Sequence, residues 1–310
     1  MPHARKRVVI VGSIALDDVH TPAGEEHRIL GGAAVYGAMA CSLFAPVDIV
    51  GVAGDDFPQT HIDTLTARGI NLDGLQIIPG GKTFHWGGTY EGDMNEAQTR
   101  FTELGVFEHF NPTLPEPYRD NDFVFLANID PELQLHVLDQ VRRPRLVICD
   151  SMNLWINIKR DAVLEVLRRS DIALLNDGEA RLLFETHSLP RAADQLLALG
   201  LARAVIKKGS HGAQMFSRDG MFAVPSIPLT DVRDPTGAGD TFAGGLIGFL
   251  ASRPAIDEMA FRQALLVGSA CASFVVEDFS VRRTAAITRQ EVEARCRLLH
   301  EAIHCEPVRL

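Results

Sequence analysis

Short apolar runs alternate with longer amphipathic stretches over the second half of the chain, and this alternation predicts an α/β fold. The runs have the length of strands that are buried on both faces: residues 123–127, 146–149, 172–175 and 204–207. The stretches between and after them carry apolar side chains at helical spacing: residues 131–141, 161–169, 179–184 and 191–199. Such a series builds a parallel sheet through right-handed crossovers, with helices on both faces.

The N-terminal region adds two buried strands that end on acids. Residues 7–17 form an apolar run that breaks at Gly12 and ends at Asp17, and residues 47–57 form a second run. We expect a helix at residues 64–67 and a turn at residues 68–71. Ligands of open α/β sheets bind beyond the carboxyl ends of the strands, so Asp17 is a candidate site residue.

Residues 75–101 depart from this pattern. Polar and apolar residues alternate over 81–90, a polar turn follows over 91–98, and alternation resumes at 99–102. This predicts an antiparallel hairpin outside the parallel sheet. Residues 1–310 are therefore expected to form one α/β domain, a three-layer α/β/α sandwich with a mostly parallel central sheet. A small β lid, built from about residues 18–30 and 81–103, would cover its site.

Composition narrows the possible partners. The 310 residues are 46% hydrophobic and carry a net charge of −10, which argues against a nucleic-acid surface. No apolar run approaches the roughly twenty residues of a membrane span, and no export signal precedes the first strand. The five scattered cysteines fit reduced thiols. We therefore expect a cytoplasmic protein with a small-molecule partner.

The stretch 232–245 carries the strongest chemical signal. A turn of Gly237, Ala238 and Gly239 leads through Asp240 into an apolar helix rich in small residues. The N–H groups at such a helix start are unpaired and, with the helix dipole, form an anion hole. A carboxylate beside that hole is suited to accept a proton from a hydroxyl that attacks a phosphoryl group. The alternative is an N-capping aspartate after a glycine hinge.

Other polar and glycine residues are placed to join this site. Gly31 and Gly32 precede a second helix of small residues, which allows either close approach of a ligand or tight helix packing. The remaining candidates follow successive strands and should converge at one edge of the sheet: Asn128, Asp130, Asp150, Asn153, Asn176, Glu179, Lys207, Gly209 and Gly212.

Two further motifs give weaker evidence for a function. Gly81-Lys-Thr83 resembles the end of a phosphate-binding P-loop, but Gln76 stands where that motif requires glycine and no helix follows. His300 and His304 match a His-Glu-x-x-His zinc motif at the end of the chain, where a solvated helix is the better interpretation.

Together these motifs resemble the ribokinase family of carbohydrate and nucleoside kinases, also called the phosphofructokinase-B type. The signature Asp-x-Thr-Gly-Ala-Gly-Asp-x-Phe matches residues 234–242, the Gly-Gly signature matches Gly31 and Gly32, and Asn-x-x-Glu matches Asn176 to Glu179. The resemblance implies an ATP-dependent kinase that transfers the γ-phosphate to a primary hydroxyl of a sugar or nucleoside. Its cofactors would be ATP and Mg²⁺, with K⁺ in some members, and its lid hairpins often pair in homodimers.

The resemblance also assigns roles to residues. Asp240 would be the general base, and the N–H groups of Gly237, Ala238 and Gly239 the anion hole. The acceptor would contact Asp17, Gly31, Gly32, Tyr36, Phe84 and Trp86. The nucleotide would contact Asn176, Lys207, Gly209, Gly212, Gly268 and Ser269. Glu179 and Asp150 would hold Mg²⁺ mainly through water, and Asp234 and Thr236 match a monovalent-cation site.

One position departs from the family pattern. Tyr36 stands where many sugar-binding members carry an asparagine, so one phenolic hydroxyl replaces an amide that can bridge two sugar hydroxyls. With the aromatic residues of the lid, this fits a nucleoside at least as well as a free sugar. Three other interpretations stay open: a ligand-binding sensor without turnover, a vitamin-type kinase, and a sugar-phosphate kinase, for which Lys82 and Arg100 are thin support.

Overall fold

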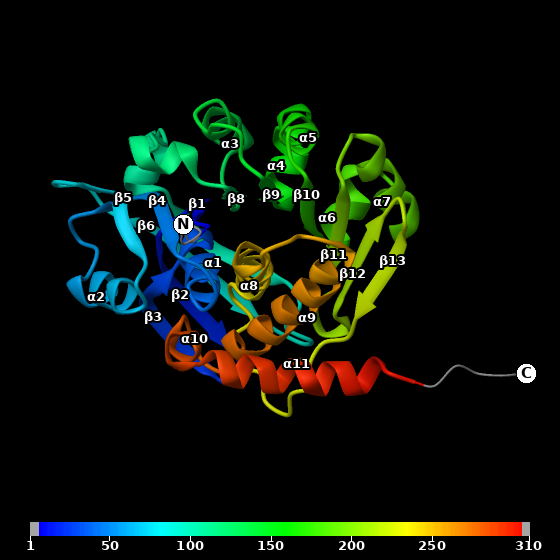
Figure 1. Ribbon diagram of the computed structural model, residues 1–310. Helices are drawn as coiled ribbons and strands as arrows, with labels where there is room; N and C mark the ends of the chain where they lie inside the picture. Colours follow the sequence, from blue (N-terminus) through cyan, green and yellow to red (C-terminus); the bar gives the residue numbers. More distant parts are fainter. Residues whose placement is uncertain (1–5, 306–310) are drawn as a thin grey trace, which may run out of the picture.

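Nine strands form the central sheet in the computed structural model, which describes residues 6–305 (Figure 1). From edge to edge the sheet consists of β13 (Gly220–Val224), β12 (Ala213–Ser217), β11 (Arg203–Lys207), β10 (Ile172–Asn176), β9 (Leu146–Asp150), β8 (Phe123–Leu126), β1 (Val8–Val11), β4 (Val47–Gly54) and β5 (Asn71–Ile78). Neighbouring strands are parallel from β11 to β5, and only the β12 and β13 pairings are antiparallel. The alternating pattern of the sequence therefore correctly predicted a mostly parallel sheet, although not all of its strands.

Helices cover both faces because side chains alternate along each strand. Val8 and Ile10 belong to one core cluster, whereas Val9 and Val11 belong to the other. The first face is covered by α1 (Ala33–Cys41), α2 (Gln59–Ala67), α8 (Ala238–Ser252), α9 (Glu258–Val275), α10 (Arg282–Ala286) and α11 (Arg289–Ile303). The second is covered by α3 (Pro131–Leu138), α4 (Asn153–Ile158), α5 (Arg160–Arg168), α6 (Asp177–Leu183) and α7 (Leu189–Ala198), and by the 3-10 turns η1 (Gly105–His109) and η2 (Glu116–Asp120). Figure 1 shows the two layers above and below the sheet.

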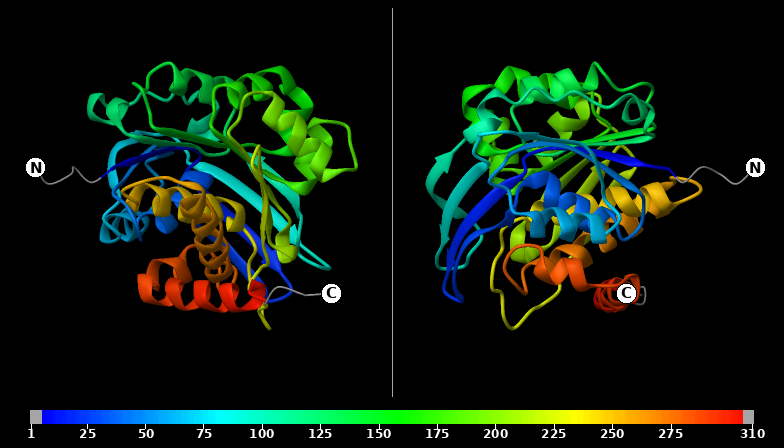
Figure 2. Two further views of the ribbon diagram at one scale, coloured as in Figure 1. Left: turned by 45° about the vertical axis from the view of Figure 1, so that its right-hand side comes forward. Right: turned by 90° about the vertical axis from the view of Figure 1, so that its left-hand side faces the viewer.

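A second sheet forms the lid, which we define as the four strands β3 (Gly24–Gly31), β2 (Ala15–Thr21), β6 (Phe84–Tyr90) and β7 (Ala97–Glu103), in this order. The predicted hairpin is β6–β7, and β2 joins it in parallel to β6. Val19, Ile29 and Tyr90 pack with Phe279 in a small apolar cluster. Figure 2 shows these strands extending away from the main sheet along one side of the molecule.

Two sequence-based expectations were wrong, and one hairpin was not predicted. Residues 7–17 are not one strand, because the chain leaves β1 after Val11 and enters the lid at Ala15; Asp17 thus lies in the lid sheet. The connecting Ser13 accepts hydrogen bonds from the N–H groups of Ala33 and Ala34. Residues 71–78 form the edge strand β5, although residue 71 was expected in a turn, and the hairpin β12–β13 was not predicted.

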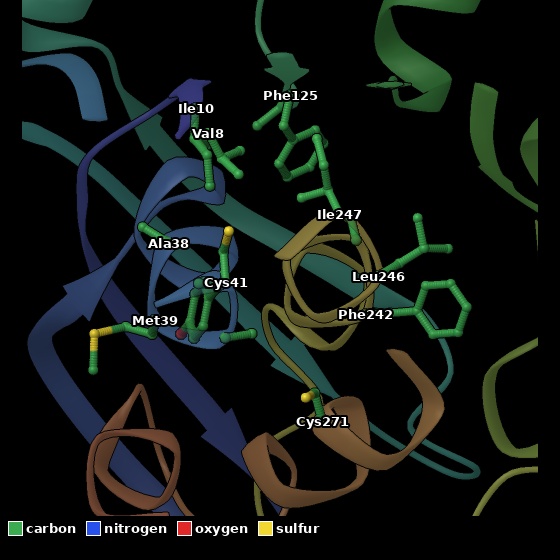
Figure 3. Packing of buried hydrophobic residues seen from close by; sticks show 14 of the residues in the cluster. Val8, Ile10, Ala38, Met39, Cys41, Phe125, Phe242, Leu246, Ile247 and Cys271 are labelled. Carbon is green, nitrogen blue, oxygen red and sulfur yellow. The ribbon is translucent and has the colours of Figure 1, made fainter. Parts of the chain in front are cut away.

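Small residues bring α1 and α8 close together beneath the sheet. A Cβ at Gly244 of α8 would collide with the carbonyl oxygen of Gly37 in α1, and one at Gly248 would lie 2.8 Å from the carbonyl oxygen of Cys41. Figure 3 shows this packing, with Phe125 of β8 next to Ile247 of α8. The position of the α8 N-terminus is therefore fixed by backbone contact as well as by side chains.

Within residues 6–305, no helix is both long and apolar enough to cross a membrane. Cys41, Cys149 and Cys271 are buried thiols, and burial raises the pKa of Cys149 to about 12. Residues 1–5 and 306–310, which the predicted domain includes, lie outside the described residues.

Candidate active site

A cavity of about 710 Å³ opens where three parallel strands end. Asp150, Asn176 and Lys207 are the last residues of β9, β10 and β11, and all three line it. Other predicted site residues in its wall are Glu179, Gly209, Gly212, Ala238, Gly239, Asp240 and Ser269. The predicted convergence of polar strand ends is therefore observed in the structure, and it includes the start of α8.

The first turn of α8 gives the cavity its anion-binding character. Gly237 caps the helix with φ 73° and no capping side chain. Among the residues that the structure describes, nothing accepts a hydrogen bond from the N–H groups of Gly237 or Gly239. The N–H of Ala238 instead donates to the carbonyl of Pro235 at 3.2 Å, because residues 235–238 form a tight turn. The expected anion hole thus has two unengaged N–H groups rather than three in this conformation.

Asp240 is a half-buried carboxylate on this turn. Burial, followed by the nearby charge of Asp150, raises its pKa to about 7, while Lys207 opposes the shift. Lys207 Nζ donates to Asp150 Oδ2 at 2.5 Å. A Cβ at Gly239 would lie 3.0 Å from the same Nζ, so the ammonium group lies directly beside the anion hole. A carboxyl group whose pKa is raised toward neutral pH is suited to acid–base catalysis.

The N-terminus of α6 contributes a second rigid element. Asn176 and Glu179 form a capping box: the N–H of Asn176 donates to Glu179 Oε2, and the N–H of Glu179 donates to Asn176 Oδ1, both at 2.7 Å. Burial, followed by Asp150, raises the pKa of Glu179 to about 8. A neighbouring cation strongly stabilises the ionised form of a carboxylic acid with this pKa.

The carboxylates of this cavity fit a hydrated magnesium ion. Across residues 6–305, no three His, Cys, Asp or Glu side chains converge closely enough to hold a metal by themselves. Glu179 accepts one hydrogen bond, from the N–H of Asn176, whereas Asp150 accepts on both oxygens, from the N–H of Ser151 and from Lys207. Magnesium keeps several waters and shares its coordination with phosphate, so two such carboxylates are compatible with it.

Asp17 and Tyr36 lie behind the α8 turn, outside the cavity wall. The Asp17 carboxylate covers Gly31, where a Cβ would collide with it. Burial, followed by the charges of Asp234 and Asp240, raises the pKa of Asp17 well above its usual value. Gly32 caps α1 at φ 102°, and a Cβ there would strike the backbone of Ser13. Both glycines are thus required by close approach within the protein.

Tyr36 is 2% exposed, and its ring packs flat against Gly237. Its hydroxyl has no hydrogen-bond partner among the described residues. Burial, followed by Asp17 and Asp234, raises its pKa well above the usual value, so the hydroxyl keeps its proton. A buried donor without an acceptor costs free energy unless a ligand supplies one.

Asp234 and Thr236 lie between the α8 turn and the lid. Asp234 is 1% exposed and accepts hydrogen bonds from the N–H groups of Thr236 at 2.9 Å and Ser280 at 3.2 Å. Thr236 donates to the hydroxyl of Tyr90 at 3.2 Å. In residues 6–305, no lysine or arginine forms an ion pair with Asp234.

Three residues that were predicted to contact ligands do not line this cavity. Gly268 is behind the cavity wall, where a Cβ would lie 2.9 Å from the carbonyl oxygen of Phe242, so it serves α8–α9 packing. Phe84 stacks on Phe107 with ring centres 5.2 Å apart, and Trp86 donates to Thr99 within the lid at 3.3 Å. Neither aromatic residue lines the cavity.

Residues that the sequence analysis missed form the opposite wall. Tyr90, Asp93, Met94 and Asn95 come from the end of the lid hairpin, and residues 226–229 come from the loop after β13. The polar turn was visible in the sequence, but nothing in it indicated which part of the chain it would meet.

The cationic and histidine motifs do not point to other chemistry. Lys82 pairs with Asp56 at 3.9 Å and Arg100 pairs with Glu25 at 3.3 Å, both at the surface. His300 and His304 are exposed on α11 and just after it, away from the cavity.

Comparison with known proteins agrees with this geometry. The model of the pfkB family of carbohydrate kinases matches residues 6–288. A cytidine kinase from Thermococcus kodakarensis is 31% identical over 256 residues, which cover 80% of this chain and 90% of that protein. The sequence similarity therefore extends across both the lid and the cavity.

Solved structures with the same fold include two nucleoside kinases. The enzyme from Methanocaldococcus jannaschii, a member of the ribokinase family, superposes with a TM-score of 0.75 and 22% identity, covering 94% of this chain and 98% of that one. The enzyme from Burkholderia thailandensis, solved in complex with ADP-inosine, has a TM-score of 0.76 and 22% identity over 95% and 96% of the two chains. At this identity the comparison establishes the ribokinase-like fold, as the sequence predicted.

Proposed function

The chain belongs to the pfkB family of carbohydrate kinases, and from that premise we propose that it transfers the γ-phosphate of ATP to the primary hydroxyl of a nucleoside. The observation that carries this proposal is the position of Asp240. Its half-buried carboxylate stands at a helix start with free N–H groups, in one cavity with Lys207 and Glu179. A base beside an anion hole is the arrangement that phosphoryl transfer to an alcohol needs.

In this mechanism the acceptor hydroxyl gives its proton to Asp240 as its oxygen attacks the γ-phosphorus. The bond between the γ-phosphorus and the bridging oxygen of the β-phosphate breaks, and ADP leaves with that oxygen. The N–H groups of Gly237 and Gly239 and the ammonium group of Lys207 bind the oxygens of the transferred phosphoryl group. Asp150 holds Lys207 in place through its 2.5 Å ion pair. The lid excludes water, which would otherwise compete as the acceptor.

Glu179 and Asp150 would hold Mg²⁺ through water, with Asn176 fixing the orientation of Glu179. The ion supplies positive charge that neutralises the phosphate oxygens. A monovalent cation such as K⁺ would be held beside Asp234 and Thr236. This part of the proposal is supported by the burial of Asp234 without an ion-pair partner in the described chain.

The acceptor side favours a nucleoside over a free sugar. Tyr36 has an apolar ring and one hydroxyl that lacks a hydrogen-bond partner in the described residues. An asparagine at this position would have two polar groups. The lid adds the ring of Tyr90, which lines the cavity and packs against Val19 and Ile29. The similarity to a cytidine kinase points the same way. A sugar phosphate is disfavoured because Lys82 and Arg100 are engaged at the surface.

Two further predictions concern assembly and location. The outer lid strand β7 is mostly exposed, which leaves room for pairing with a second lid. We retain a homodimer through the lid and a cytoplasmic location as predictions.

The test is ADP release with a panel of acceptors: cytidine, inosine, adenosine, ribose, fructose, a sugar phosphate and a vitamin alcohol. We expect turnover with at least one nucleoside at a kcat/KM well above that of any free sugar. Preference for fructose or ribose would overturn the nucleoside assignment. Nucleotide binding without turnover on any acceptor would instead indicate a sensor.

A further inference from the structure

The end of the lid hairpin reaches across the cavity to the nucleotide side. We call residues 91–96, between β6 and β7, the lid tip. Asn95 Oδ1 lies against the Cα of Gly209, where a Cβ would collide with it. Oε1 of Glu96 lies 4.0 Å from a Cβ built at Gly178, next to Asn176. The lid tip therefore meets two segments more than eighty residues away in the sequence, both of which flank the proposed phosphate site.

The lid tip is internally ordered rather than a loose loop. The N–H of Met94 donates to the carbonyl of Glu91 at 3.0 Å, and Gly92 and Met94 adopt φ of 59° and 54°. Asp93 accepts hydrogen bonds from the backbone N–H of Asn95 at 3.2 Å and from its Nδ2 at 2.7 Å. The Asn95 amide is thereby oriented with its oxygen toward Gly209.

The lid tip lines the cavity without filling it. Asp93, Met94 and Asn95 all belong to the wall, and about 710 Å³ remains open with them in place. This lies within the range of about 300–1,000 Å³ that small-molecule sites occupy. The tip carries Glu91, Asp93 and Glu96 but no lysine or arginine. An enclosed polyphosphate therefore needs Mg²⁺ to avoid repulsion from these carboxylates.

We propose that the lid tip is a wall of the nucleotide site, with Asn95 as the residue that positions it against Gly209. Closing the lid then encloses the nucleoside triphosphate as well as the acceptor. The inference depends on the proposed function in one respect only, namely that the cavity binds a nucleotide. It implies that Mg²⁺-bound nucleotide reduces local opening of the lid tip even when no acceptor is present.

The experiment uses the full chain with ADP and Mg²⁺ as the probe and no acceptor. Calorimetric Kd values are compared for the wild type, Asn95→Ala and the control Gln98→Ala, an exposed residue of β7 outside the cavity wall. Loss of the contact should raise the Kd for Asn95→Ala by about fivefold, while Gln98→Ala stays within about twofold. Amide hydrogen exchange of residues 91–96 should slow when ADP and Mg²⁺ are added.

A double-mutant cycle distinguishes loss of the contact between Asn95 and Gly209 from a general effect on folding. Gly209→Ala is strained at φ 53° in any background, but its methyl group also collides with Asn95. The increase in Kd caused by Gly209→Ala should therefore be smaller in the Asn95→Ala background than in the wild type. Additive effects together with unchanged exchange of the lid tip would overturn the proposal. A lower Kd for Asn95→Ala would overturn it as well, because the tip would then block the site.

These outcomes remain distinct from failure of the proposed function. Tip-dependent ADP binding without turnover on any nucleoside would leave this inference standing and refute the acceptor assignment. No binding of ADP with Mg²⁺ to the wild type would refute both.

Discussion

Removing the hydroxyl of Tyr36 should have opposite effects on stability and on acceptor binding. The ring is 2% exposed and packs on Gly237, so Tyr36→Phe creates no large cavity. Its hydroxyl has no partner in the described residues, and an unsatisfied buried polar group costs about 1–3 kcal/mol. Recovering part of that cost should raise the free energy of unfolding by about 1 kcal/mol and Tm by about 2 °C.

Acceptor binding should weaken in the same variant. If the hydroxyl donates to the nucleoside, its loss removes a hydrogen bond of about 1 kcal/mol and raises KM for the acceptor about fivefold. KM for ATP should stay within about twofold. Thermal unfolding and initial rates of ADP release measure both effects.

Tyr90→Phe is the matched control because the Tyr90 hydroxyl already has a partner, Thr236 at 3.2 Å. That variant should lose stability rather than gain it. A destabilised Tyr36→Phe with unchanged acceptor KM would refute the reasoning, since the hydroxyl would then serve the fold and not the ligand.

Three further predictions concern the catalytic base, the packing of α8 and the cation. Asp240 must be ionised to accept a proton, and burial raises its pKa to about 7. The value of kcat/KM should therefore fall about tenfold per pH unit below about pH 7 and level off above it. A flat profile from pH 5.5 to 8 would contradict this role. Gly244→Ala would force a methyl group against the Gly37 carbonyl and should lower the free energy of unfolding by about 2 kcal/mol or more in a denaturant titration; unchanged stability would show that α1 and α8 separate easily. Replacing K⁺ by tetramethylammonium at constant ionic strength should lower kcat severalfold if a cation stabilises buried Asp234, and an equal rate in both salts would remove that site from the proposal.

Local sequence patterns were sufficient to predict a mostly parallel sheet, because most of its strands are short apolar runs buried on both faces. The glycine turn before Asp240 was equally readable, since a helix start with free N–H groups is a local property. The edge strand β5 was missed because polar residues interrupt its apolar ones and only Gly74 of its eight residues is buried, so it lacks the continuous apolar run of the other strands. The break between β1 and β2 was missed because an apolar run does not reveal which sheet each half joins.

The long-range contacts of the site could not be obtained in this way. The position of Asn95 against Gly209 depends on how the lid hairpin folds back over the cavity, and neither segment carries a signal for the other. The Ala238 N–H, expected in the anion hole, is engaged because Pro235 closes a turn that the motif alone does not specify. Gly268 matched a position that contacts the nucleotide in the family, but its lack of a side chain allows α9 to pack closely against α8.

The most direct test of the account is Asp240→Asn, which keeps the size of the side chain but removes the proton acceptor. Its kcat for nucleoside phosphorylation should fall by about 10²-fold to 10⁴-fold, while Kd for ADP with Mg²⁺ stays within about threefold, because the N–H groups and Lys207 remain. A variant that turns over at close to the wild-type rate would contradict the assignment of Asp240 as the catalytic base.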